Sequence, residues 1–72
     1  MTLKEAAGQI ERASGDHQAL LAKTYREGAA IAETLGEATI AKDWTTAAVT
    51  RETAAAAHYE KAKTLGVYGD RA

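Results

Sequence analysis

The residues best suited to chemistry in this chain are two histidines, one serine and several scattered carboxylates. Nucleophilic catalysis requires an activated hydroxyl or thiol beside an oriented base. The single serine, Ser14, is followed by Gly15 and Asp16, a pattern more typical of a helix end than of a nucleophile. The chain has no cysteine, which excludes thiolate chemistry and disulfides.

Metal and phosphate chemistry are also poorly supported by the residue spacing. His17 and His58 are the only histidines, and zinc takes four ligands. No glutamate has a histidine three residues later, as a di-metal helical bundle requires. No glycine-rich phosphate loop is present. We therefore predict no metal, no other cofactor and no enzymatic activity, although four histidines could meet in a two-fold dimer.

The elements that must position these residues are helices. Thr2 and Glu5 form a capping-box pattern, which predicts a first helix over about 3–14. Ser14, Gly15 and Asp16 then predict a break, and apolar residues at helical spacing predict a second helix over about 17–35. One continuous helix through Gly15 remains an open alternative.

The third predicted helix covers about 40–65 and is rich in alanine, the strongest helix former. Thr39 or Asp43 is expected to cap its start. Lys61 and Lys63 favour the negative end of the helix dipole, and Gly66 supplies the left-handed residue that often ends a helix. Residues 67–72 are predicted to be a frayed tail.

A short connection near Glu37 and Ala38 predicts that neighbouring helices run antiparallel. The expected fold is all-α: an antiparallel helical hairpin with a short N-terminal helix, in one small helical domain covering 1–72. Because large apolar residues are few and no disulfide is possible, we expect oligomerisation to complete a small bundle.

Heptad spacing predicts which residues face each other in this hairpin. The chosen register places Ile31 opposite Trp44, Thr24 opposite Arg51, and His17 opposite His58. The expected contact stripes are Leu3, Ile10, His17, Thr24 and Ile31 with Ala7, Ser14, Leu21, Gly28 and Leu35 on one side, and Trp44, Arg51, His58 and Leu65 with Ala48, Ala55 and Ala62 on the other.

Four apolar residues do not fit that contact stripe, namely Leu20, Tyr25, Val49 and Tyr59. Apolar residues on a second helix face indicate a second packing surface. We predict that these four bind a protein partner. The alternative is that they pack on the N-terminal helix in a monomeric three-helix bundle.

The formal net charge of −1 comes from interspersed acidic and basic residues, so nucleic-acid binding is not favoured. The alternative considered is a small helix-turn-helix-like regulator of DNA, in which Thr45, Thr46, Thr50 and Thr53 of the third helix would contact phosphates. The sequence contains no apolar run long enough to span a membrane and no apolar segment of a signal peptide, so we expect a cytoplasmic protein.

A helical hairpin with Trp44 near its turn resembles the layout of small secreted WXG-type proteins. The resemblance covers only this layout, because Trp44-Thr45-Thr46 lacks the glycine of that motif. Tyr59 and Tyr68 also lack an acidic residue four positions later, where that family carries its export signal.

Taken together, the absence of catalytic motifs and the unplaced apolar residues predict a non-enzymatic protein–protein interaction module, such as an adaptor, assembly factor or small regulator, that self-associates as a dimer.

Overall fold

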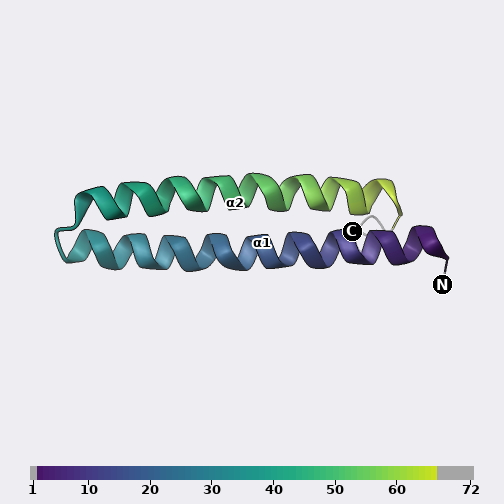
Figure 1. The fold of residues 1–72 in the computed structure, drawn as a ribbon, viewed down its shortest axis with the longest axis horizontal. Helices are drawn as coiled ribbons and strands as arrows, with labels where there is room; N and C mark the ends of the chain where they lie inside the picture. The colour runs from purple at the N-terminus through teal and green to yellow at the C-terminus, as the bar shows by residue number, and fades with distance from the viewer. Residues whose placement is uncertain (1, 67–72) are drawn as a thin grey trace.

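Two long helices joined by a short connection form an antiparallel hairpin (Figure 1). The computed structural model describes residues 2–66, in which α1 is Leu3–Thr34 and α2 is Ala38–Thr64. The molecule is a rod with extents of 51 × 19 × 13 Å. The start of α1 and the end of α2 lie at one end of the rod, and the connection lies at the other (Figure 1). The predicted all-α hairpin is confirmed.

The start of α1 is held by the predicted capping box. The Thr2 hydroxyl accepts the backbone N–H of Glu5 at 3.0 Å, and the Glu5 carboxylate accepts the backbone N–H of Thr2 at 3.1 Å. Two backbone donors that the helix cannot satisfy internally are thereby paired.

The chain reverses at Gly36, whose φ of 79° lies in the left-handed region that glycine adopts without strain. The N–H of Glu37 donates to the carbonyl of Ala32 at 2.8 Å, and the N–H of Gly36 donates to the carbonyl of Glu33 at 3.0 Å. These two bonds define a Schellman motif. The carbonyl of Glu37 then accepts the N–H of Ala41 at 3.0 Å and so begins α2.

Helix α2 begins earlier than expected and ends where expected. It starts at Ala38 with Glu37 as N-cap and no side-chain capping bond, so the predicted cap at Thr39 or Asp43 is wrong. The Schellman bonds at Gly36 already hold Glu37 in place to start the helix. Lys61 and Lys63 lie in the last turn, and Gly66 follows with a φ of 88°. The predicted tail, 67–72, lies outside the described residues.

The predicted break at Gly15 does not occur. Helix α1 runs unbroken from Leu3 to Thr34, so within residues 2–66 there is no separate N-terminal helix and no three-helix bundle. Glycine costs a helix about 1 kcal/mol relative to alanine. Gly15 is instead buried against α2, where the ring of Tyr59 occupies the space a Cβ would need. The need for close packing explains this glycine, and the open alternative of a two-helix hairpin is the one that forms.

The contact between the helices is made by the smallest side chains. Buried residues recur every seventh position on each helix, as Gly8, Gly15, Ala22 and Ala29 on α1 and Ala41, Ala48, Ala55 and Ala62 on α2. We call these eight residues the alanine seam. All buried hydrophobic residues of the described chain are alanines. The hairpin therefore has a continuous line of contact but buries little apolar area per residue.

Candidate interaction surface

The large apolar side chains lie outside the alanine seam. Leu3, Ile10 and Ile31 share one heptad position, and Leu35 follows Ile31 by one helical turn. All four are exposed, Leu3 by 91 % and Leu35 by 72 %. The sequence stripe that contains them was predicted to form the helix–helix contact. That prediction is wrong because glycine and alanine, not leucine and isoleucine, occupy the seam.

Helix α2 contributes to the same side of the hairpin through Trp44. A Cβ built on Gly28 would lie 2.8 Å from Trp44 Cε3, so the indole ring packs directly on this glycine. Gly28 shares its heptad position with Leu35, and Ile40 lies one turn before Trp44. We call the exposed set Leu3, Ile10, Ile31, Leu35, Ile40 and Trp44 the apolar face.

The six members of the apolar face gather at the two ends of the hairpin, and polar side chains lie between the two groups. At the open end of the hairpin, Ile10 and Leu65 line a common depression that also includes Ala7. At the connection, Ile31 and Leu35 lie near Ile40 and Trp44 in sequence and register. Between the two ends, α1 places Ser14, His17 and Thr24 along the same stripe. Leu21, at its centre, is half-buried.

The four residues predicted to bind a partner do not gather on one face. Leu20 is exposed and lies about half a turn from buried Ala22, so it points away from α2. Val49 is exposed on α2, next to buried Ala48. Tyr25 and Tyr59 are half-buried at the helix–helix boundary. Their predicted role in partner binding stays a prediction.

Tyr59 is engaged within the hairpin. Its hydroxyl donates a hydrogen bond of 2.6 Å to Asp16 Oδ1, and its ring covers Gly15. On the same side of the molecule, alanines floor an open groove of about 670 Å³ that Tyr59, Arg26 and Glu52 border. This side lies opposite the apolar face, since its residues flank the other edge of the seam.

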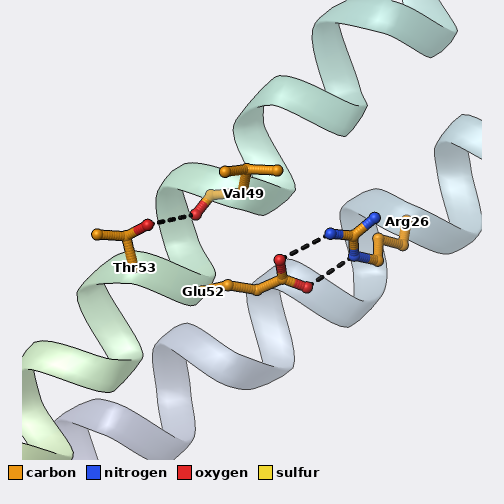
Figure 2. A network of polar contacts seen from close by, with 4 residues as sticks. All are labelled: Arg26, Val49, Glu52 and Thr53. Carbon is orange, nitrogen blue, oxygen red and sulfur yellow. Dashed lines mark hydrogen bonds and ion pairs between the residues drawn. The ribbon is translucent and has the colours of Figure 1, made fainter.

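Arg26 and Glu52 join the two helices across this groove with two parallel hydrogen bonds, as Figure 2 shows. Arg26 Nε lies 2.7 Å from Glu52 Oε2, and its Nη2 lies 2.7 Å from Oε1. The hydrogen bond from the guanidinium lowers the pKa of Glu52, and the same bond raises the pKa of Arg26. Both side chains are nearly half exposed, so solvent screens the pair.

Two polar contacts cross the seam on the side of the apolar face. His58 Nδ1 donates to Glu11 Oε2 at 2.9 Å, and Arg51 Nη1 donates to Gln18 Oε1 at 3.1 Å. The predicted pairs, His17 with His58 and Thr24 with Arg51, are not the hydrogen-bonded ones, although His17 and His58 border one shallow depression. Trp44 packs on Gly28 instead of Ile31, less than one turn of α1 away, so the helices lie close to the predicted axial alignment. The helix faces that meet follow the alanine seam, because a seven-residue repeat of small side chains allows the helices to meet closely.

The threonines proposed to contact phosphates are engaged in their own helix. The hydroxyls of Thr45 and Thr46 donate to the carbonyls of Ala41 and Lys42 at 2.8 and 3.1 Å. Those of Thr50 and Thr53 donate to Thr46 and Val49 at 3.1 and 3.0 Å, the latter drawn in Figure 2. A phosphate oxygen needs these same donors. No observation on residues 2–66 therefore favours the DNA-binding alternative.

In the part of the chain that the structure describes, no group of three or more histidine, cysteine, aspartate or glutamate side chains could hold a metal ion. No helix within 2–66 is long and apolar enough to span a membrane. The cytoplasmic location stays a prediction.

Comparison with family models, with curated proteins and with solved structures found no match to this chain. Its function must therefore be argued from its own surface.

Proposed function

We propose that this chain is a non-enzymatic helical interaction module that works by binding protein through its apolar helix surfaces, and that it self-associates. One observation carries the proposal. The residues buried within the hairpin are small, whereas Leu3, Ile10, Ile31, Leu35 and Trp44 remain in contact with water. An arrangement that inverts the usual distribution of large and small apolar residues is typical of a chain whose packing is completed by another chain.

The energetics support the same proposal. Fully burying a leucine or isoleucine contributes roughly 1.5–3 kcal/mol, whereas an alanine contributes much less. A chain of 72 residues has a small core at best, and within residues 2–66 the buried hydrophobic residues are alanines alone. Association would cover the exposed leucine and isoleucine side chains and add the missing stabilisation.

The solution mass and the thermal midpoint test this proposal together. Sedimentation equilibrium should give at least twice the monomer mass of 7.6 kDa, and Tm should rise with protein concentration. A monomer mass with a Tm independent of concentration would contradict self-association. The proposal of an interaction module would then require a partner protein of different sequence that raises the Tm of this chain when it is added.

A further inference from the structure

We infer that the apolar face is the self-association surface, and that a second copy of this chain docks on it antiparallel about a two-fold axis. The inference rests on the proposed function, because it names the surface and geometry through which self-association takes place. The surface consists of Leu3, Ile10, Ile31, Leu35, Ile40 and Trp44, together with the half-buried Leu21 and Leu65.

The first argument is the amount of apolar area. A large aliphatic side chain removes roughly 100 Å² of apolar surface from water when it is buried. Because these side chains are only partly exposed, the six members of the apolar face supply roughly 400 Å², about half of the roughly 800 Å² that each partner contributes to a standard interface. The smaller side chains between them must supply the rest. The six members lie along one side of a rod 51 Å long, so a second rod of the same length can cover them together.

The second argument is that the α1 stripe is self-complementary. From the N-terminus, its members run from large apolar residues, through a middle that is small or polar except for the half-buried Leu21, back to large apolar residues: Leu3, Ala7, Ile10, Ser14, His17, Leu21, Thr24, Gly28, Ile31 and Leu35. An isologous interface needs such a symmetric pattern, since each residue must match a different residue of the same surface.

An antiparallel second copy with the axis near Ala19 pairs these members by size. Leu3 meets Leu35 of the second copy, Ala7 meets its Ile31, and Ile10 meets its Gly28 with the Trp44 ring that covers it. Towards the axis, Ser14 meets Thr24 of the second copy. Ala7 with Ile31 pairs a small residue with a large one, as in facing helices that interdigitate, and Ser14 with Thr24 pairs two polar residues. Leu3 with Leu35 pairs two large apolar residues at each end, and His17 meets Leu21 beside the axis.

A parallel second copy would lack this match. Leu3 would then meet Leu3, Ile10 would meet Ile10 and Ala7 would meet Ala7, so no large residue would face a small one. In a parallel dimer, the open end of one copy would also lie far from the apolar residues at the connection of the second copy. The antiparallel arrangement brings the Ile10 and Leu65 depression of one copy onto the Ile31, Leu35 and Trp44 cluster of the other.

The surface can be tested with a matched pair of substitutions. Ile31 and Leu20 are both 61 % exposed on α1, but only Ile31 belongs to the apolar face. Ile31→Lys should weaken the dimer on the order of tenfold to a hundredfold, as loss of a buried apolar anchor does. Leu20→Lys should leave the dimer constant unchanged. An equal loss of dimer affinity in both variants, or a loss in Leu20→Lys alone, would overturn the assignment of the apolar face as the dimer surface.

The orientation can be tested by cross-linking, because the chain contains no cysteine of its own. Leu3→Cys and Leu35→Cys proteins are mixed under reducing conditions and then oxidised. We expect the mixed disulfide in large excess, since Leu3 and Leu35 of different copies meet, whereas two copies of Leu3 would lie about 48 Å apart. Mainly Leu3-to-Leu3 disulfide would overturn the antiparallel arrangement.

The solution mass of the unsubstituted protein separates failure of this inference from failure of the proposed function. A dimer mass with no cross-link at either end, and with Ile31→Lys still dimeric, rejects the apolar face but leaves self-association in place. A monomer mass at every concentration rejects both. Circular dichroism on each variant checks that its helix content is unchanged.

Discussion

The ring of Tyr59 lies over the backbone of Gly15, and its hydroxyl donates a 2.6 Å hydrogen bond to Asp16 Oδ1. A Cβ at residue 15 would stand 2.7 Å from Tyr59 Cε1 and 2.8 Å from Cδ1. Both distances are too short for carbon atoms in contact, so any side chain at residue 15 must displace the ring. This relationship keeps a glycine in the middle of a 32-residue helix.

Gly15→Ala is therefore expected to destabilise the hairpin. Alanine would gain about 1 kcal/mol of helix propensity, whereas displacement of the ring by overpacking costs about 1–3 kcal/mol. The net loss should be about 1 kcal/mol in the free energy of unfolding, measured by urea denaturation. In a Tyr59→Ala background the same change should become stabilising, because only the propensity gain remains. A more stable Gly15→Ala variant in the parent chain would contradict the packing seen here.

Gly28→Ala should move the indole of Trp44. The new Cβ would lie 2.8 Å from Cε3 and 2.9 Å from Cζ3 of the ring. Since Trp44 is the only tryptophan, its fluorescence reports this contact without interference. We expect emission to shift to longer wavelength as the ring turns towards water. Glu27→Ala, at the exposed neighbouring position, serves as the control and should leave the emission unchanged.

The alanine seam should not tolerate larger side chains. Ala22 is buried against α2, so Ala22→Leu forces the helices apart and should cost about 1–3 kcal/mol in the free energy of unfolding. Ala13 is exposed on the same helix, and Ala13→Leu should change that free energy by no more than a few tenths. Equal effects at the two positions would mean that the seam does not set the helix spacing.

The sequence predicted the helices and their ends better than the helix faces that meet. The capping box at Thr2, the reversal at Gly36 and the stop at Gly66 follow from local backbone chemistry, and the structure shows all three. The contact face depends on which stripe of α1 meets α2, and the prediction took large apolar residues to mark that stripe. Gly8, Gly15, Ala22 and Ala29 repeat every seventh residue, and this signal was available in the sequence.

The candidate surface was harder to predict for the same reason. Once leucine and isoleucine were assigned to the helix–helix contact, Leu20, Tyr25, Val49 and Tyr59 were what remained. The structure shows Tyr59 bonded to Asp16 across the hairpin and leaves Leu35 exposed. Periodicity alone does not distinguish a stripe that packs on its own hairpin from one that remains open to another chain.

The contact between His58 and Glu11 should show measurable coupling. Because the two atoms lie 2.9 Å apart and both side chains are half-buried, we expect a coupling energy of about 1 kcal/mol in a double-mutant cycle of Glu11→Gln and His58→Gln. The same cycle with His17→Gln in place of Glu11→Gln should give a smaller coupling, because His17 borders the same depression as His58 but makes no hydrogen bond to it. Stronger coupling of His58 to His17 than to Glu11 would show that the contact with Glu11 does not form in solution.

The Arg26–Glu52 pair should make stability depend on pH in one direction. Hydrogen bonding from Arg26 lowers the pKa of Glu52 in the folded chain below its ordinary value of 4.5. The unfolded chain therefore binds a proton on this carboxyl at higher pH than the folded chain does. The stabilisation is complete above the ordinary pKa and is lost as pH falls through the lowered folded value. The raised pKa of Arg26 has no effect in this range, because the guanidinium is protonated in both the folded and the unfolded chain.

Glu52→Gln should abolish this contribution. The difference in Tm between the parent and Glu52→Gln should be largest near neutral pH and low salt, and it should shrink towards zero both in acid and in high salt. The effect should be small, because the two side chains are 49 % and 45 % exposed and solvent ions screen them. Glu27→Gln removes one exposed carboxylate from α1 without touching the pair, so it controls for the change in net charge. A Tm difference that grows as the pH is lowered would reverse the sign expected from a depressed carboxyl pKa, and would show that Arg26 does not stabilise the ionised form of Glu52.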